Sequence, residues 1–353
     1  MNCIAVSAEK PIRVLIDVHR GQVWATVPPV AVDGESWTLV WWYLGEQGVL
    51  CERSVSDGGR AIQDALAQLQ RLDQHQRDVW HVLHVASQVQ GRCDRALQQV
   101  QDRLPIIQRQ AERVAQGKKA RGRAPLANVA EHEQRIAQVR YVAQAIRYLS
   151  QELHSELLVV VLRKARVLNS REREQELEAL LVLWEEVAKE ASPTLRKEIQ
   201  SLSKQLRLAL PHLVRFAADL DDPQEQACQR LGPEAVRLMA GAWQRRSVLG
   251  PTNKDLVEGF DPAWREEAQA LLHVWEQTVR ASSAVENWQS IVRPHLAVHR
   301  TLSAGMLARL SVWHNHHVAP RGVHEGLSPL QRTGTLQVET DWLVALGYSL
   351  QAA

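Results

Sequence analysis

The sequence predicts an α/β core that is interrupted by a long all-helical insertion. Three observations support this fold class. Short apolar segments alternate with two helical patterns over residues 1–84, a helical composition runs from 85 to 280, and helices with a loop occupy 281–353. Strand and helix patterns followed by a long helical stretch are typical of an α/β core that carries an insertion. We therefore assign 1–84 and 281–353 to the core and 85–280 to the insertion.

The core begins with short strands. Apolar runs bounded by turn residues are typical of buried strands. Two helices are expected between these strands, at 37–44 and 60–72. Ile62, Leu66 and Leu69 recur on one face of the second helix, which is the spacing of an amphipathic helix. Four segments have the strand pattern: 12–18, 23–32, 51–56 and 77–83.

The insertion has a helical pattern throughout. Gln, Glu, Arg, Leu and Ala dominate it, and apolar residues recur at steps of three and four. Breaks are expected near Pro105 and, in the last part of the core, at Pro294. The sequence shows no fixed-period repeat, so a solenoid is not expected. One series with helical spacing is Ile136, Val139, Val142, Ile146, Leu149 and Leu153.

The overall charge limits where a nucleic acid could bind. The formal net charge is only +2, so a nucleic-acid site requires local clustering of Lys and Arg rather than a global field. A loop between two expected helices has such a cluster, and it can bind phosphates. A solvated loop is the structural alternative. The cluster contains Lys118, Lys119, Arg121 and Arg123.

Cysteine usage and hydropathy indicate a cytoplasmic protein that does not contact a membrane. The four cysteines are scattered and form no CxxC pair, which fits a reducing compartment. The longest apolar run is the six residues of 157–162. A membrane span needs roughly 20 such residues.

Three acidic residues are candidates for metal chemistry. Asp57 ends an expected strand at a Gly-Gly turn, where a turn or cap residue is the structural alternative. Glu286 follows Ser283 at the spacing of a capping box, so a helix-start glutamate is its alternative. Asp17 follows the first clear strand, and its alternative is a surface aspartate at a strand end.

Two more polar residues lie on the expected strand 77–83. The alternation of a strand places Asp78 on one face and His81 on the other. A lone histidine in such a position is usually a structural hydrogen-bonding group. The His-Asn-His-His run at 314–317 has no Cys or acidic partner at zinc-finger spacing, so polar helix-end chemistry is expected there.

The order and spacing of these motifs resemble those of bacterial insertion-sequence DDE transposases. Residues 280–294 resemble the segment around the last acidic residue of that family. In this sequence Glu286 stands at the acidic position, and Asn287 and Arg293 accompany it. Other resembling segments are 56–60 and 78–81 upstream, and 313–316, 326–330 and 342–348 downstream.

This resemblance implies an RNase H-like mixed-sheet core and DNA cleavage with strand transfer. Three carboxylates of the family hold two Mg²⁺ ions about 4 Å apart. One ion activates the attacking water or 3′-OH, and the other stabilises the leaving oxygen. Asp57 and Glu286 would be two of the three ligands. The implied partners are transposon ends, target DNA and further copies of the chain, in a bacterial cytoplasm.

The resemblance leaves the first acidic ligand open. Residues 11–17 resemble the family's second strand, so 2–6 would be the first strand and Asn2 or Cys3 would stand at the acidic position. The alternative makes Asp17 the first acid and leaves the sheet one strand short. With a start inside this first strand, we expect a 5′-truncated or decayed element, or a misplaced start codon. An inactive remnant that acts only as a DNA-binding or protein-interaction module is therefore the alternative function.

Overall fold

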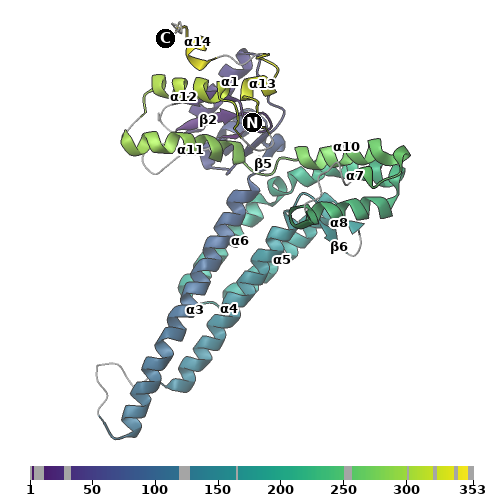
Figure 1. Ribbon diagram of the computed structural model, residues 1–353. Helices are drawn as coiled ribbons and strands as arrows, with labels where there is room; N and C mark the ends of the chain where they lie inside the picture. Colours follow the sequence, from purple (N-terminus) through teal and green to yellow (C-terminus); the bar gives the residue numbers. More distant parts are fainter. Residues whose placement is uncertain are drawn as a thin grey trace. The chain divides into compact units, whose positions relative to one another are not determined.

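The computed structural model divides the chain into two units. One unit is Met1–Trp80 with Gln277–Ala353, and the other is His81–Glu276. Figure 1 colours both along the sequence. The borders predicted from the sequence, 84/85 and 280/281, lie four residues further along than these. The structure describes residues 2–3, 12–27, 33–118, 128–163, 166–249, 257–299, 302–320, 324–337 and 341–348.

Helix predominates, and the fold class predicted from the sequence is wrong. The chain is 72% helical and only 7% strand. It is therefore a predominantly helical protein rather than an α/β protein, and the RNase H-like assignment is corrected with the class. The physical reason is the shortness of the described strands, the longest of which has 5 residues. The expected strand 77–83 is mostly helix, because α3 (Val79–Ala115) begins within it.

The first unit contains a small sheet. Its strand order is β3-β2-β1-β4-β5. β1 is antiparallel to β2 and parallel to β4, and β5 is parallel to β4. The carboxyl ends of β1, β4 and β5 therefore lie at one edge, and the carboxyl end of β2 lies at the opposite edge. The strands are β1 Asn2–Cys3, β2 Arg13–Ile16, β3 Val23–Val27, β4 Ser54–Ser56 and β5 His75–Arg77.

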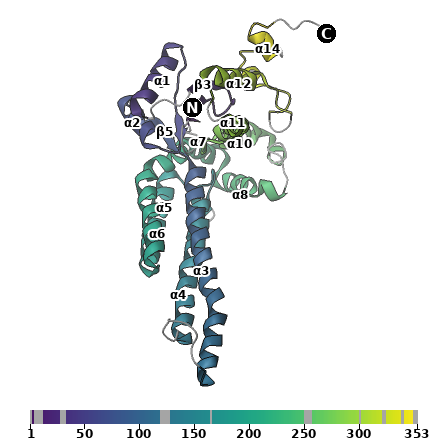
Figure 2. The same cartoon turned by 90° about the vertical axis from the view of Figure 1, so that its left-hand side faces the viewer.

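Two pairs of helices cover the faces of this sheet (Figure 2). Val14 and Ile16 of β2 pack in one core cluster with residues of α11 and α12. Leu15 points to the other face, where it packs with residues of α1 and α2. Successive side chains of a strand point to opposite faces, so one short strand serves both cores. The helices are α1 Gly34–Glu46, α2 Arg60–Gln68, α11 Ser283–Val298 and α12 Ala304–His316.

The second unit is built from helices and one small hairpin. α3 and α4 (Val129–Glu156) run side by side (Figure 1). Arg147 pairs with Asp94 at 2.9 Å, and the His132 Nε2 atom lies 2.7 Å from the Val100 carbonyl oxygen. The other elements are β6 Leu162–Arg163, β7 Arg166–Val167, α5 Ser170–Glu190, α6 Pro193–Leu213, α7 Arg215–Leu231, α8 Pro233–Leu249, η2 Pro262–Trp264 and α10 Arg265–Gln277.

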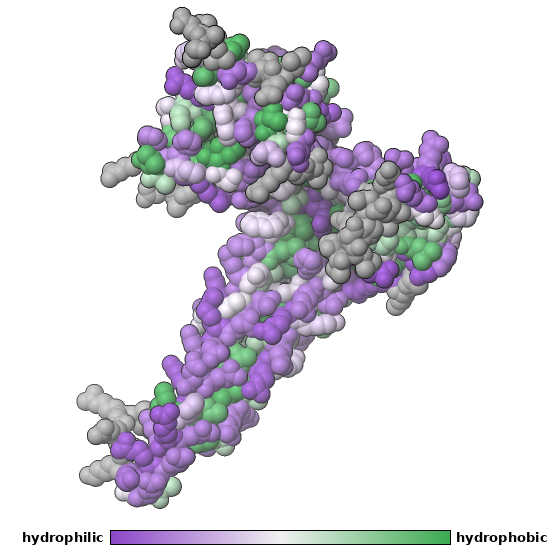
Figure 3. All heavy atoms as spheres, in the orientation of Figure 1, coloured by the Kyte–Doolittle hydropathy of each residue, from purple (hydrophilic) through white to green (hydrophobic). Residues whose placement is uncertain are grey.

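Two expected helix breaks are not breaks. Pro105 lies inside α3 and Pro294 lies inside α11. Figure 3 shows mainly hydrophilic side chains along α3 and α4, which is the pattern of solvated amphipathic helices. Among the described helices, none is both long and apolar enough to cross a membrane. The remaining short elements are η1 Leu72–Gln74, α13 Pro329–Arg332 and α14 Trp342–Ala345.

A buried arginine organises the loop between α4 and β6. Arg173 of α5 is fully buried, and its guanidinium donates hydrogen bonds to the backbone carbonyls of Leu158 and Val159. The same group lies over the ring of Phe216, 5.6 Å from its centroid. Peptide carbonyls buried in this loop therefore find their donors in a side chain rather than in a helix or a sheet.

Candidate functional site

Asp57 lies in a tight turn directly after β4. Its Oδ1 atom accepts a hydrogen bond from the Gly59 backbone N–H at 2.9 Å. The Ser56 hydroxyl accepts one from the Gly58 backbone N–H at 3.1 Å. Gly58 has a φ of +67°, a backbone conformation that glycine adopts readily and other residues do not. Asp57 is half-buried, so the turn leaves part of its carboxylate open to a ligand.

A buried histidine supports this turn from the neighbouring strand. His75 of β5 is fully buried. Its Nδ1 atom lies 3.2 Å from the Ser54 hydroxyl, and its Nε2 atom lies 3.4 Å from the Ser56 hydroxyl. No pattern in the sequence marked His75. The available signal was the pair of serines at alternate positions of β4, which places both hydroxyls on one face.

Asp78 joins β4 to the start of α11. Its backbone N–H donates to the Ser56 carbonyl at 2.8 Å. Its buried carboxylate accepts hydrogen bonds from the Ser282 backbone N–H, at 3.1 Å, and from the Ser282 hydroxyl. The Val79 N–H donates to the Arg280 carbonyl at 2.9 Å. We call these contacts of Asp78 with Ser282 the Asp78–Ser282 lock.

Glu286 is not part of a capping box. The N-cap residue of α11 is Ser282 rather than Ser283, and its side chain makes no cap hydrogen bond. The hydroxyl of Ser282 binds Asp78 instead. The carboxylate of Glu286 lies 3.4 Å from the guanidinium of Arg293, in a pair whose side chains are 37% and 60% exposed. Such an exposed pair contributes little to stability, so the carboxylate can exchange this partner for another cation.

The structure brings the segments of Asp57 and Glu286 to the same region of the first unit. Asp57 directly follows Ser56, and Glu286 lies one helical turn after Ser282, with its N–H 3.3 Å from the Ser282 carbonyl oxygen. Asp78 connects these two anchor residues, because its backbone N–H donates to the Ser56 carbonyl and its carboxylate accepts from Ser282. Within the described residues, no group of three or more His, Cys, Asp or Glu side chains could hold a metal ion. Asp57 and Glu286 are therefore two carboxylates on segments that Asp78 connects.

Asp17 lies at the opposite edge of the sheet. Its Oδ1 atom accepts hydrogen bonds from the backbone N–H groups of His19 and Arg20, at 2.9 and 2.8 Å. It therefore closes the turn between β2 and β3. Because β2 runs antiparallel to β1, its end is at the edge away from Asp57. By contrast, Asn2 pairs through its backbone with Val55 of β4.

The other predicted site residues have less defined roles. His81 lies in the first turn of α3, so its expected alternation with Asp78 on a strand is wrong. Asn287 is exposed on α11. In the basic loop, Lys118 is exposed and its Nζ atom donates to the Gln116 side chain at 2.9 Å. Three residues of that loop lie outside the described residues: Lys119, Arg121 and Arg123.

The histidine-rich end of α12 fastens the β2–β3 hairpin. Asn315 accepts a hydrogen bond from the Val23 N–H at 2.8 Å and donates one to the Val23 carbonyl at 2.9 Å. The His314 Nε2 atom lies 2.9 Å from the Gly21 carbonyl oxygen. These side chains satisfy backbone groups of the edge strand β3 and of the turn that precedes it. Such contacts are the polar helix-end chemistry that the sequence predicted for this run.

We expect His314 to make the stability of the first unit depend on pH. Burial lowers its pKa below the usual 6.5, and Arg332 and His317 lower it further, while the hydrogen bond to Gly21 opposes them. The stabilisation is therefore full above pH 6.5 and is lost as the pH falls below that value, by at most about 1.4 kcal/mol per pH unit. The measurement is urea unfolding at pH 7.5 and 5.5.

His314→Gln should remove this pH dependence, because a glutamine amide can still donate to the Gly21 carbonyl. His299→Gln, at an exposed position, is the matched control and should keep it. Equal pH dependence in both variants would show that His314 does not titrate with folding.

Arg77 lies against the Asp57 turn, although nothing in the sequence marked it. Burial lowers the pKa of its guanidinium, and the charges of Asp57 and Asp78 oppose that shift. A Cβ atom built on Gly58 would lie 1.3 Å from the Arg77 Nη1 atom. The guanidinium therefore occupies the space that any side chain at position 58 would need.

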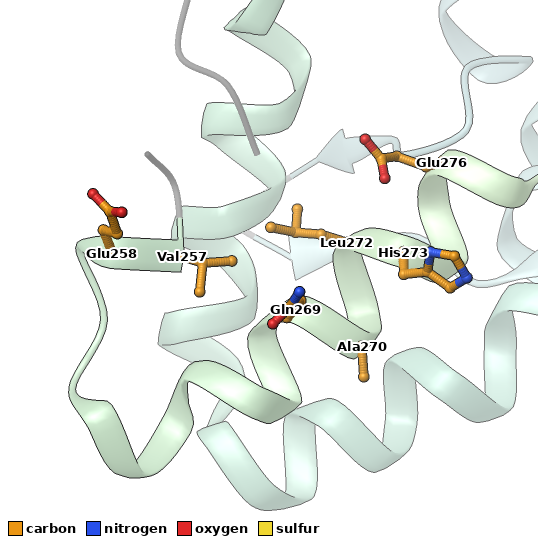
Figure 4. A pocket seen from close by; sticks show the side chains of 7 residues that line it. All are labelled: Val257, Glu258, Gln269, Ala270, Leu272, His273 and Glu276. Atoms are coloured by element: carbon orange, nitrogen blue, oxygen red, sulfur yellow. The ribbon is translucent and has the colours of Figure 1, made fainter. Parts of the chain in front are cut away.

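A separate cavity lies in the second unit (Figure 4). Its volume is about 770 Å³. The carboxylates of Glu258 and Glu276 lie on opposite sides of it in Figure 4, so they do not converge on one ligand. None of the site residues predicted from the sequence lines it. The lining residues are Val257, Glu258, Gln269, Ala270, Leu272, His273 and Glu276.

No family model, no curated protein and no solved structure matches this chain.

Proposed function

We propose that the chain is a metal-dependent DNA transposase of the DDE type, in which Asp57 and Glu286 carry the chemistry. The observation that supports this most directly is the Asp78–Ser282 lock. Together with the hydrogen bond from the Asp78 N–H to the Ser56 carbonyl, it links the turn after β4 to the first turn of α11. These are the two segments whose sequences resemble the acidic motifs of insertion-sequence transposases.

The donor set suits a hard divalent cation. Mg²⁺ is commonly held by one or two carboxylates together with substrate phosphate and water. Asp57 is half-buried and Glu286 is partly exposed, so both remain accessible to a metal ion that would also bind a DNA phosphate. A bound metal ion would activate the attacking water or the 3′-OH of the DNA and would stabilise the leaving oxygen. The role of the protein is to hold the two carboxylates and the DNA strand in place.

Two arginines near these carboxylates suit a DNA backbone. Arg293 lies 3.4 Å from Glu286. Arg60 begins α2, three residues after Asp57, and its side chain is 96% exposed. Guanidinium groups bind phosphate through paired N–H donors. The proposed partners are accordingly transposon ends and target DNA, bound by several copies of the chain in a bacterial cytoplasm.

The experiment is a plasmid-nicking assay with Mg²⁺ or Mn²⁺, using the full chain and its Glu286→Gln and Asp57→Asn variants. Both substitutions keep the shape of the side chain and remove its charge. Activity should fall by at least the roughly 10–100-fold that follows loss of a residue supporting a metal ligand. Glu35→Gln in α1 and Asp73→Asn in the turn before β5, both at exposed positions, are the matched controls. Nicking that survives both site substitutions would remove these carboxylates from the mechanism.

The second candidate function is a non-catalytic interaction module. The observation that favours it is the outer face of α1, where Leu39, Trp42 and Tyr43 are 65%, 61% and 58% exposed. Exposed aromatic residues are typical of binding hot spots. This reading expects no nicking by the unmodified chain under any metal condition. Reproducible nicking that the Glu286→Gln variant lacks would exclude it.

A further inference from the structure

The space above Gly58 is filled by a cation. The Arg77 guanidinium lies where a Cβ on Gly58 would stand, with Nη1 at 1.3 Å and Cζ at 2.5 Å from that point. The Arg77 Nε atom is buried, and within the described residues it has no hydrogen-bond partner. Position 58 therefore needs a glycine for two reasons. Its φ is +67°, and the Arg77 guanidinium packs where a side chain would stand; we call this packing position the seat.

This position places the guanidinium at the residue that follows Asp57, where its charge acts on the Asp57 carboxylate. Asp57 and Asp78 are the two acidic groups whose charges act on Arg77. Asp78 is committed to Ser282 through its buried carboxylate. One carboxylate oxygen of Asp57 accepts a hydrogen bond from the Gly59 N–H, and the residue is half-buried. Of the two, Asp57 is therefore the carboxylate that can exchange one cation for another.

We infer that the Arg77 guanidinium, which packs on Gly58, supplies the positive charge at the carboxylate site and competes with a divalent metal ion for Asp57. The inference rests on the proposed function in so far as Asp57 is a metal ligand. The physical reason is Coulomb repulsion between the guanidinium and an incoming dication, which few solvent molecules can screen at a half-buried site. Arg77 is thus a positioning residue that limits the metal affinity of the site.

The first test is Mn²⁺ binding to the full chain, measured by electron paramagnetic resonance. Arg77→Gln removes the competing charge and should lower the Mn²⁺ Kd by about tenfold or more. Arg77→Lys keeps the charge and should stay closer to the unmodified chain. If Arg77 were only structural, both substitutions would loosen the turn and raise the Mn²⁺ Kd, and Arg77→Gln would raise it at least as much as Arg77→Lys. Urea unfolding of each variant shows whether it is folded.

Substitution at the seat provides an independent test. Gly58→Ala should displace the guanidinium and tighten Mn²⁺ binding as Arg77→Gln does. Gly48→Ala is the matched control, since Gly48 has a similar φ of +78° but nothing within 4 Å of an added Cβ. It introduces the same backbone strain without moving an arginine. Adding Gly58→Ala to Arg77→Gln should change the Kd no further.

The outcomes separate this inference from the proposed function. If Asp57→Asn abolishes Mn²⁺ binding but Arg77→Gln leaves the Kd unchanged or raises it, the competition is overturned and the metal site stands. If Gly58→Ala behaves like Gly48→Ala, the seat is overturned. If no variant binds Mn²⁺, the competition and the proposed metal site are overturned together.

Discussion

Replacing Arg173 by methionine is expected to lower the free energy of unfolding of the 81–276 unit by about 3–5 kcal/mol. The fully buried guanidinium donates to the carbonyls of Leu158 and Val159, and it lies 3.4 Å from the Glu156 carbonyl oxygen. Methionine fills much of the space but has no donor. Each buried carbonyl left without a partner costs roughly 1–3 kcal/mol.

The measurement is urea unfolding combined with amide hydrogen exchange. Exchange isolates the effect on the loop 157–161, whose opening can differ from that of the rest of the chain. Arg171→Met is the matched control, because Arg171 lies two residues away on α5 and is exposed. A difference below about 1 kcal/mol between the two variants would mean that water replaces the lost donors.

Replacing Asp78 by alanine is expected to cost the first unit about 2–4 kcal/mol. The substitution removes the acceptor of two hydrogen bonds from Ser282, one from its backbone N–H and one from its hydroxyl. Both donors are buried and would lose their partner. Hydrogen bonds to a charged acceptor are roughly twice as strong as neutral ones. We also expect DNA nicking to be lost, because the start of α11 would no longer be held to the residue that follows β5, beside the Asp57 turn.

Asp73→Ala is the control, since Asp73 is exposed in the turn before β5. A double-mutant cycle with Ser282→Ala measures the coupling between the partners, which should amount to at least about 1 kcal/mol. A coupling near zero, together with unchanged nicking by the Asp78→Ala variant, would contradict the role of the lock.

Local rules predicted the helices of the first unit well and one strand badly. The expected helices at 37–44 and 60–72 correspond to α1 and α2. The expected strand 77–83 failed because its apolar residues fit two periods. Val79, Val82, Ala86 and Val89 are all buried, and their spacing of three and four is helical. An apolar run of this length does not distinguish a strand from a buried helix.

For the candidate site, the sequence marked Asp57, Asp78 and Glu286 but not the contacts that relate them. The capping prediction for Ser283 was wrong by one residue, because a buried carboxylate distant in the sequence binds Ser282. No sequence pattern marked Arg77, because its guanidinium packs against Gly58, which follows a different strand, β4. Spacing along one helix or strand cannot report such long-range pairs.

The sequence by itself determined the turn at Asp57 and the amphipathic helices, because turn chemistry and apolar spacing act between residues a few positions apart. The tertiary structure alone decided which edge of the sheet each acidic residue occupies. β4 runs parallel to β1, so Asp57 lies at the end of the sheet where α11 begins. β2 is antiparallel to β1, so Asp17 lies at the opposite end. Strand direction depends on pairing between distant segments, which no local pattern encodes.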